Sequence, residues 1–301
     1  MIIDTHIHLS HFSFNEEFPF LSLEENDFDI QRGTRKQLIQ QFQKAGIEAC
    51  IDPAIDIESN RNILALAEQF PGFLFSAVGV HPTRTFQFKT IGKDGKAVVL
   101  KLHWKQRKQL EEFADHPSVV AIGETGLDYH FERKEQHRFR QKLWFIHQLK
   151  LAYKKNLPLV LHIREADADA IRILKKYRHC LHGGVCHCFS STAEAAAVYT
   201  KLGLMLGVGG ALLMDTPKKH DLEQAVIQTP MECILLETDG PYVKPDCPNI
   251  PNKQMRKARN TSLILPAVAK RIAELKNISM EEVMRVATEN AIRLFGLHNQ
   301  I

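Results

Sequence analysis

The sequence predicts an α/β fold, a single (β/α)8 TIM barrel with extended βα loops on the C-terminal face of its strands. Short β-branched runs alternate with longer amphipathic runs along the whole chain. Several short runs, such as LPLVLHI and CILLET, are apolar on both faces, as expected of buried parallel strands. A glycine-rich phosphate turn, typical of the rival doubly wound open sheet, does not follow the first run.

Eight strands are expected, each followed by a helix, in one domain that spans residues 1–301. The strands are Ile2–His8, Ile47–Ile55, Phe73–His81, Val119–Leu127, Leu157–Ile163, Gly184–Phe189, Leu204–Gly209 and Ile234–Asp239. The helices are Thr34–Ala45, Glu58–Phe70, Gln106–Ala114, Glu132–Lys155, Ala166–Tyr177, Thr192–Lys201, Leu222–Gln228, Ser262–Leu275 and Met280–Phe295. For the last helix, Ser279 with Glu282 indicates a capping box and Gly296 a C-cap.

Three connections are longer than usual, and all follow the C-terminal end of a strand, where barrels carry their working loops. His11–Gly33 contains five phenylalanines among acidic residues. Thr83–Trp104 contains the turn signal Lys93-Asp94-Gly95-Lys96, which predicts a hairpin insertion. Tyr242–Asn260 is rich in proline, lysine and arginine.

The bulk composition is that of a soluble globular protein. The net charge of +4 is compatible with an anionic substrate but is far below that of a nucleic-acid coat protein. The polar start MIIDTHIH does not fit a secretory signal, and no run of 18 apolar residues predicts a membrane span. Six cysteines in a chain of this length do not indicate a disulfide scaffold. We expect a cytoplasmic protein with reduced thiols and no obligate protein partner.

Ionisable side chains interrupt the apolar strands near their C-terminal ends. A buried histidine or carboxylate costs several kcal/mol unless it is paired or bound to a metal. The strand ends converge on one mouth, and residues far apart in sequence therefore meet there. The residues are His6, His8, His81, Glu124, His162, His187, Glu237 and Asp239. Because side chains alternate along a strand, His6 should point the same way as His8, and Glu237 the same way as Asp239.

Four imidazoles and two carboxylates at one mouth are typical of a dinuclear metal site. Imidazole suits Zn²⁺ and other transition metals, and carboxylates also accommodate Mg²⁺ and Mn²⁺. Two such cations would lower the pKa of a water molecule and neutralise the attacking and leaving oxygens. The prediction is a hydrolase with two divalent cations, Mg²⁺, Mn²⁺ or Zn²⁺.

Taken singly, each of these residues also has an explanation that involves no metal or catalysis. Fifteen histidines produce chance HxH pairs, and a lone His162 is more often a satisfied core histidine. The remaining histidines are expected at the surface or in packing: His11, His103, His116, His130, His137, His147, His179, His220 and His298. The run from Cys180 to Cys188 resembles a compact zinc cluster, but in a strand Cys186 and Cys188 would face away from His187 and pack under the helices.

The ordered segments of the chain resemble one known family. DTHIHL, GVHP, AIGETGLDY, LPLVLHIREA, GVCHCFS, LLETDGPY and the ending IAELKNISMEEVMRVATENAIRLFGL occur in the order and spacing of the TatD family of metal-dependent deoxyribonucleases. Together they cover essentially the whole chain. The resemblance implies a TIM barrel of the metallo-dependent hydrolase superfamily with two divalent cations. It also implies 3′→5′ exonuclease action on single-stranded DNA, with some members acting on RNA or D-aminoacyl-tRNA.

The resemblance also implies a role for each residue. His6 and His8 would hold one metal, His162 and His187 the other, and Glu124 would bridge them. Asp239 would bind metal and help to activate the water, and Glu237 matches an acidic position tied to activity in the family.

Other residues are candidates for contact with the substrate. His81 and Arg164 could bind a phosphate, although a salt bridge that holds a loop explains Arg164 equally well. The basic run Lys253, Arg256, Lys257 and Arg259 could follow a nucleic-acid backbone, and a solvated loop is its more common explanation. The long loops leave the substrate open, and they allow an ester or amide hydrolase, such as a D-aminoacyl-tRNA deacylase, as the alternative. A non-catalytic scaffold would not need six potential metal ligands.

Overall fold

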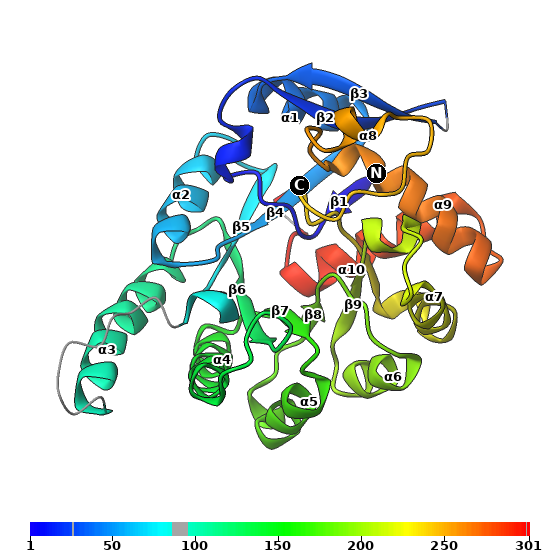
Figure 1. The fold of residues 1–301 in the computed structure, drawn as a ribbon. Helices are drawn as coiled ribbons and strands as arrows, with labels where there is room; N and C mark the ends of the chain where they lie inside the picture. Colours follow the sequence, from blue (N-terminus) through cyan, green and yellow to red (C-terminus); the bar gives the residue numbers. More distant parts are fainter. Residues whose placement is uncertain (26, 86–95, 299) are drawn as a thin grey trace.

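Eight parallel strands form the centre of the molecule in a computed structural model that describes residues 1–25, 27–85, 96–298 and 300–301. The strands lie side by side in chain order, with helices around the outside (Figure 1). They are β1 (Ile2–Asp4), β4 (Ile47–Pro53), β5 (Leu74–Val78), β6 (Val119–Asp128), β7 (Leu159–Arg164), β8 (Gly184–Cys186), β9 (Met205–Val208) and β10 (Ile234–Leu236). The backbone N–H of Thr5 donates to the Leu236 carbonyl, which brings β1 beside β10. The predicted TIM barrel is confirmed.

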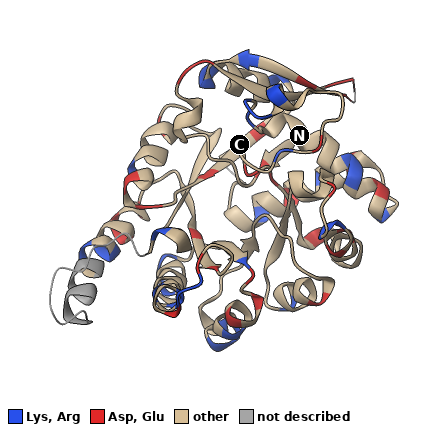
Figure 2. Cartoon of the chain, in the orientation of Figure 1, with Lys and Arg blue, Asp and Glu red and all other residues tan. Residues whose placement is uncertain are grey.

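The helices alternate with the strands as predicted. They are α1 (Arg35–Lys44), α2 (Ile57–Ala67), α3 (Lys96–Phe113), α4 (Glu135–Lys155), α5 (Asp167–Lys176), α6 (Ala193–Lys201), α7 (Lys219–Gln228), α8 (Asn252–Met255), α9 (Leu265–Lys276) and α10 (Met280–Phe295). At α10 the Ser279 side chain accepts the Glu282 N–H, but the Glu282 carboxylate accepts from Arg285 instead of the Ser279 backbone, so the N-cap forms without the full capping box. The predicted C-cap is confirmed, since Gly296 is left-handed at φ 68°. Acidic and basic residues are interspersed on the outer helices (Figure 2).

The aromatic segment His11–Gly33, expected as a long connection, contains regular structure instead. Strands β2 (Phe18–Glu24) and β3 (Asp27–Gly33) pair in an antiparallel hairpin. Phe14, Phe18 and Phe20 are buried. The hairpin is bound to the loop after β10, because the Leu21 N–H donates to the Arg259 carbonyl. Phe18 and Phe20 therefore belong to the packed face of the hairpin, which lies near α1 and α8 (Figure 1).

The hairpin predicted within Thr83–Trp104 falls on residues 86–95, which lie outside the described part. From Lys96 onward the backbone is helical, so α3 begins ten residues before the predicted start at Gln106.

Six strands end earlier than predicted, four of them by three residues or more, and this determines how the mouth of the barrel is built. β1 ends at Asp4, β5 at Val78, β8 at Cys186 and β10 at Leu236. Beyond two of these ends the backbone becomes left-handed, with φ 44° at Cys188 and 53° at Asp239. A strand cannot continue through that conformation. Most of the candidate site residues therefore lie in turns that follow the strands.

The barrel interior is filled by apolar side chains below the mouth. Ile3, Ile51, Phe75, Val160 and Leu235 belong to one buried cluster, which also includes residues from the end of α10. This close-packed interior makes the barrel a solid support for the mouth rather than a pore. Among the described residues, no helix combines the length and apolarity that crossing a membrane would need.

Candidate metal centre

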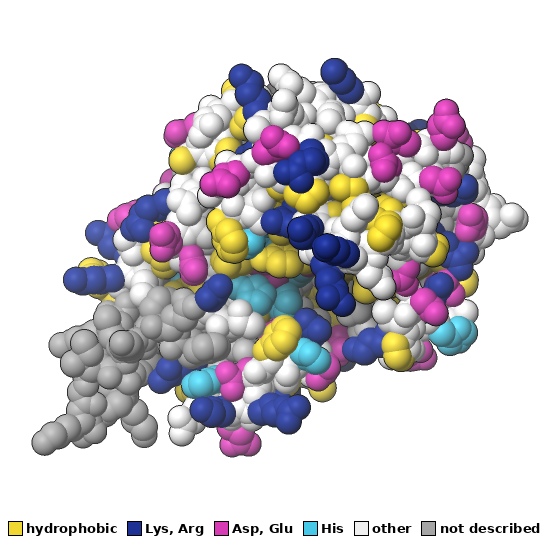
Figure 3. Space-filling model, turned by 45° about the horizontal axis from the view of Figure 1, so that its top comes forward, with side chains coloured by type: hydrophobic (Ala, Val, Ile, Leu, Met, Phe, Trp, Pro, Cys, Tyr) yellow, Lys and Arg dark blue, Asp and Glu magenta, His cyan; other side chains and the backbone are white. Residues whose placement is uncertain are grey.

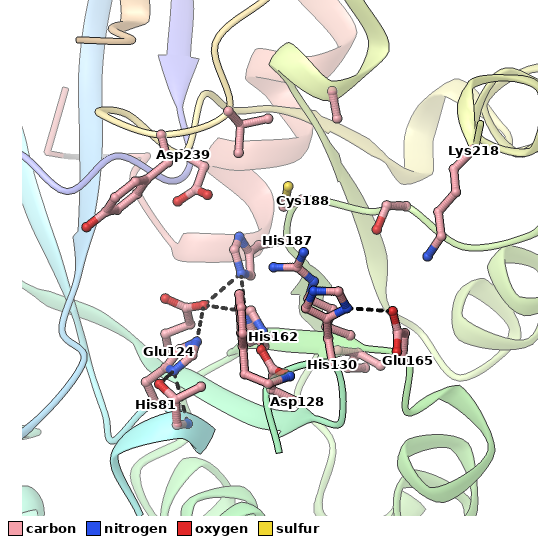
Figure 4. A pocket seen from close by; sticks show the side chains of 18 of the residues that line it. His81, Glu124, Asp128, His130, His162, Glu165, His187, Cys188, Lys218 and Asp239 are labelled. Atoms are coloured by element: carbon pink, nitrogen blue, oxygen red, sulfur yellow. Dashed lines mark hydrogen bonds and ion pairs between the residues drawn. The ribbon is translucent and has the colours of Figure 1, made fainter. Parts of the chain in front are cut away.

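The six predicted metal ligands meet at one cavity of about 870 Å³. Five of them line it directly, and His6 lies fully buried behind them, beside His187. Figure 4 shows Glu124, His162, His187 and Asp239 turned toward a common centre. Figure 3 shows histidine side chains at the bottom of this hollow, with lysine and arginine side chains beside it. The set is His6, His8, Glu124, His162, His187 and Asp239.

Glu124, in β6, occupies the middle of the cluster and faces two groups of imidazoles. Its Oε1 lies 2.7 Å from Nε2 of His187 and 2.8 Å from Nδ1 of His162. Its Oε2 lies 3.7 Å from Nε2 of His6 and 3.8 Å from Nε2 of His8. Each carboxylate oxygen thus faces a different pair of the predicted ligands, and Oε1 also lies 3.2 Å from Nε2 of His81.

The first pair also faces Asp239. The Asp239 Oδ1 lies 3.6 Å from Nε2 of His6 and 3.4 Å from Nε2 of His8. The two imidazole nitrogens are 3.4 Å apart. Two ligand atoms bound to one cation at about 2.0–2.2 Å are typically separated by about 3–3.5 Å. The spacing of these donor atoms therefore fits a shared cation.

The outer nitrogen of His8 has a partner that orients the ring. Its Nδ1 lies 3.1 Å from the Pro53 carbonyl oxygen. A carbonyl can only accept, so Nδ1 carries the hydrogen and the Nε2 lone pair points to the centre. This is the usual outer contact of a metal-binding histidine.

On the other side, His162 contacts a carboxylate that the sequence analysis missed. The Asp128 Oδ2 lies 3.0 Å from Nε2 of His162, opposite Glu124. Asp128 is the last residue of β6 and lines the cavity. The acidic residue in GLDY, one position beyond the predicted strand, was the available signal.

His81 is arranged as a hydrogen-bond donor. The Thr83 N–H donates to Nδ1 of His81, which caps the short 3₁₀ turn Pro82–Arg84. The hydrogen of the ring is therefore on Nε2, which lies 3.2 Å from Oε1 of Glu124. With this tautomer His81 can donate to an anionic substrate oxygen at the cavity wall.

Glu237 lies behind the histidines, whereas Asp239 lines the cavity. Oε1 of Glu237 accepts the Cys188 N–H at 2.6 Å and lies 3.9 Å from Nδ1 of His187. Its side chain passes against Gly207, where a Cβ would lie 2.1 Å from Oε2. The strand ends at Leu236, so the alternation that predicted a shared direction for the two acids does not continue this far.

Three buried polar atoms in this region have no hydrogen-bond partner among the described residues: Nδ1 of His6, Nδ1 of His187 and Oε2 of Glu237. Burial, and then the neighbouring Asp239, raise the pKa of Glu237 well above its usual value. Burial, and then His187, lower the pKa of His6 well below its usual value. A neutral imidazole is the form that binds a metal.

The carboxylates raise the pKa of two other imidazoles, so a proton and a metal cation compete for the nitrogens that face the centre. Burial lowers the pKa of His8, but Asp239 and Glu124 outweigh the effect of burial and raise the pKa to about 9. For His162, Asp128 and Glu124 likewise outweigh burial and raise the pKa to about 9. The carboxylates thus create a strong preference for positive charge at the centre, which divalent cations satisfy. The donor set fits metal binding.

The cysteines do not form a metal cluster within the described chain. Cys180 and Cys186 belong to the buried apolar core. None of the compact groups of potential ligands found in the described residues contains a cysteine. Cys188 was expected under the helices, and that is wrong: the backbone turns after β8, and Cys188 lines the cavity.

The predicted substrate residues lie at different distances from the centre. His81 and Arg164 line the cavity, together with His130, which was expected to be a surface or packing residue. The basic run from Lys253 to Arg259 belongs to α8 and the loop after it, outside the residues that line the cavity. In this run the backbone of Arg259 pairs with the β2 strand at Pro19.

Comparisons with known proteins show which family the chain resembles along its length. The family model described as TatD related DNase matches residues 3–296. The uncharacterized metal-dependent hydrolase YabD of Bacillus subtilis is 30% identical over 298 residues, which cover 99% of this chain and 100% of that protein. The 3′-5′ ssDNA/RNA exonuclease TatD of a Rahnella species is 30% identical over 280 residues, covering 92% and 97%.

A solved structure extends the likeness to three dimensions. YjjV, a TatD homolog from Escherichia coli, superimposes with a TM-score of 0.77 at 26% identity and covers 98% of both chains. With a barrel of matching topology, a family match along almost its full length and a compact histidine–carboxylate centre, the chain belongs to the TatD family of metal-dependent hydrolases.

Proposed function

We propose that the protein is a two-metal phosphodiesterase that removes nucleotides from the 3′ end of single-stranded DNA or RNA. The single observation that carries the proposal is the position of the Glu124 carboxylate between two pairs of predicted ligands. Its Oε2 faces His6 and His8, and its Oε1 faces His162 and His187. A carboxylate in that position would serve as a ligand to both of two cations and would reduce their mutual repulsion. The barrel acts as one catalytic domain in this proposal.

The two cations would have separate ligands apart from Glu124. His6, His8 and Asp239 would hold the first, and His162 and His187 the second. Mixed imidazole and carboxylate donors accept Zn²⁺ or Mn²⁺, and the carboxylates also accept Mg²⁺. Oε1 of Glu237 lies 3.9 Å from Nδ1 of His187, and potential ligand atoms of Glu237, His6 and His187 lie within 4.8 Å of one another. We infer that Glu237 is a positioning residue for both rings.

Hydrolysis of a phosphodiester needs a deprotonated water and neutralisation of the phosphoryl oxygens. Two divalent cations held at this centre supply both. Asp239 lines the cavity and is the carboxylate placed to accept the proton of the water. His81 donates through Nε2–H to a phosphoryl oxygen, and Arg164 offers a guanidinium to the same anion.

Nucleic acid is the substrate class that best fits the cavity. Arg84, Arg164 and Lys218 are cations along its wall, suited to a polyanion. Relatives that match most of the chain are named 3′-5′ ssDNA/RNA exonucleases. The cavity is also wide enough for a nucleotide, since ligand cavities of about 300–1,000 Å³ hold molecules of that size.

The test uses a 5′-labelled single-stranded oligonucleotide with Mg²⁺, Mn²⁺ or Zn²⁺. The wild-type protein should shorten it from the 3′ end, and Asp239→Ala should reduce the rate at least about 100-fold, as expected when a group acting in the transition state is removed. Asp115→Ala, at an exposed aspartate paired with Lys155, is the matched control and should keep the rate.

Two outcomes would contradict the proposal. Equal activity of Asp239→Ala and wild type would identify the nuclease as a contaminant. Faster turnover of D-aminoacyl-tRNA or another ester than of DNA or RNA, at the same metal concentration, would reassign the substrate while keeping the metal centre.

A further inference from the structure

An exposed aromatic ring stands at the rim of the cavity, directly beyond the metal-facing residues. Phe131 follows β6 in the loop before α4, lines the cavity and is 68% exposed. The guanidinium carbon of Arg164 lies 4.8 Å from the centre of its ring. His130 contacts the ring edge-on, at 4.8 Å and 84°. One face of the phenyl ring is thus covered by a cation, and the large exposed fraction leaves the other face open.

The ring is tied to the metal centre through one carboxylate. Oδ1 of Asp128 accepts the Phe131 N–H at 2.9 Å, while Oδ2 lies 3.0 Å from Nε2 of His162. Asp128 is almost fully buried. The same carboxylate therefore holds the backbone at Phe131 and orients a metal-facing histidine. A side chain exposed at random would not require such a contact.

The charges around the ring favour an anion next to an aromatic group. Arg164 and Lys218 both line the cavity, and both act electrostatically on Glu165. Glu165 also lines the cavity, and its Oε1 lies 2.7 Å from Nδ1 of His130. This contact holds the pKa of Glu165 below its usual value. Two cations thus remain to meet a phosphate beside the open ring face.

We propose that Phe131 and Arg164 form a stacking platform for a base of the nucleic-acid strand, an inference that rests on the proposed function. A base that stacks on the phenyl face leaves its phosphate between the cations and the metal centre. Flat aromatic and guanidinium surfaces bind bases without sequence preference, because every base has a π-face. The platform therefore selects a base-bearing phosphodiester over one without bases, with little preference among the four bases.

The experiment compares two oligonucleotides of equal length. One carries normal nucleotides, and the other has abasic residues at its two 3′-terminal positions. Wild type should cleave the base-bearing strand with a kcat/KM higher by about 10-fold or more, the range that stacking of a base supports. Phe131→Ala should lose about the same factor on the base-bearing strand and less than about twofold on the abasic strand.

Phe139→Ala is the matched control. Phe139 is 61% exposed, comparable with Phe131, but it lies in α4 and is not among the cavity-lining residues. This variant should keep the preference of the wild type. Phe131→Trp should also keep it, whereas Phe131→Leu, which preserves apolar bulk without a flat face, should lose it. The Trp and Leu variants decide the matter if the alanine variant is poorly folded.

The outcomes separate this inference from the proposed function. Wild-type cleavage of both strands at equal rates overturns the stacking platform while the exonuclease stands. Equal loss on both strands in Phe131→Ala and Phe131→Leu also overturns it, because the ring would then act through Asp128 on the metal centre. Absence of cleavage of either strand by metal-loaded wild type overturns the exonuclease and the platform together.

Discussion

Oδ2 of Asp128 lies 3.0 Å from Nε2 of His162, on the side of the imidazole opposite Glu124. A carboxylate in this position favours the hydrogen on Nε2, which would leave Nδ1 as the nitrogen available to a cation. Register explains the proximity, since Gly126 and Asp128 of β6 stand opposite His162 and Arg164 of β7. The chain at Gly126 passes so close that a Cβ there would lie 2.1 Å from the His162 carbonyl oxygen.

Removal of the Asp128 carboxylate should weaken metal binding. Asp128→Ala is expected to lower the affinity of the centre by about 10–100-fold, the usual cost of losing an outer partner of a metal-binding histidine. Titration of metal-free protein with Zn²⁺ or Mn²⁺ in a calorimeter measures it. Asp169→Ala, at a carboxylate paired with Lys142 on α4, is the control and should bind as wild type does. Unchanged affinity in Asp128→Ala would contradict the assignment of His162 as a ligand.

His81 should affect the reaction rather than the metals. His81→Ala is expected to lower kcat by about 100-fold, as for loss of a donor to a developing anion, with metal stoichiometry unchanged. His116→Ala is a close control, because its Nδ1 accepts the Ser118 N–H and its Nε2 lies 3.2 Å from Glu68, the same arrangement at the protein surface. Loss of bound metal in His81→Ala would instead make His81 a ligand.

Much of this site could be predicted from sequence, because parallel strands carry their C-terminal ends to one mouth. The apolar runs around His162 and Glu124 located both residues within strands. The positions of Cys188 and Glu237 could not be found in this way. They lie in turns whose left-handed residues, Cys188 and Asp239, depend on contacts with other strands. Periodicity carries no information once a strand has ended.

The N-terminal hairpin shows a different limit. Phe18 and Phe20 are buried on either side of the partly buried Pro19, but Leu21 and Ser22 are buried as well, so β2 lacks the regular alternation that predicts a strand. The partner strand, Asp27–Gly33, contains mostly polar residues and has weak strand character in isolation. It forms because β2 is already fixed, with the Thr261 hydroxyl donating to the Leu21 carbonyl.

Asp52 should make stability depend on pH. Burial raises its pKa from 3.8 to about 7, although His8, the Ser10 hydrogen bonds and Arg35 oppose this. A carboxyl that binds its proton more tightly in the folded chain stabilises the fold below about pH 4, and this contribution is lost as the pH rises through about 7. Asp52→Asn keeps the shape and removes the titration.

The free energy of unfolding of Asp52→Asn, relative to wild type, should therefore increase by more than about 1 kcal/mol between pH 4 and pH 8. Urea unfolding at one-unit intervals of pH measures the difference, in which the other titrating groups cancel. A difference that stays constant over this range would show that Asp52 remains ionised in the folded protein.

Gly207, in β9, should tolerate no side chain while Glu237 is present. A Cβ there would lie 2.1 Å from Oε2 of Glu237 and 3.1 Å from the His187 Cα. Gly207→Ala is expected to reduce stability by about 1–3 kcal/mol, as overpacking of a filled interior does. Its activity should also fall, because the displaced Glu237 side chain would carry the Cys188 backbone with it.

A double-mutant cycle separates this contact from general strain in the strand. Glu237→Ala opens the space that the new methyl group needs, so Gly207→Ala should cost at least about 1 kcal/mol less in that background than in wild type. Urea unfolding of the four proteins gives the coupling energy. If the two substitutions were additive, the Gly207 strand would be strained by the His187 backbone alone, and Glu237 would not depend on the glycine for its place behind the two histidines.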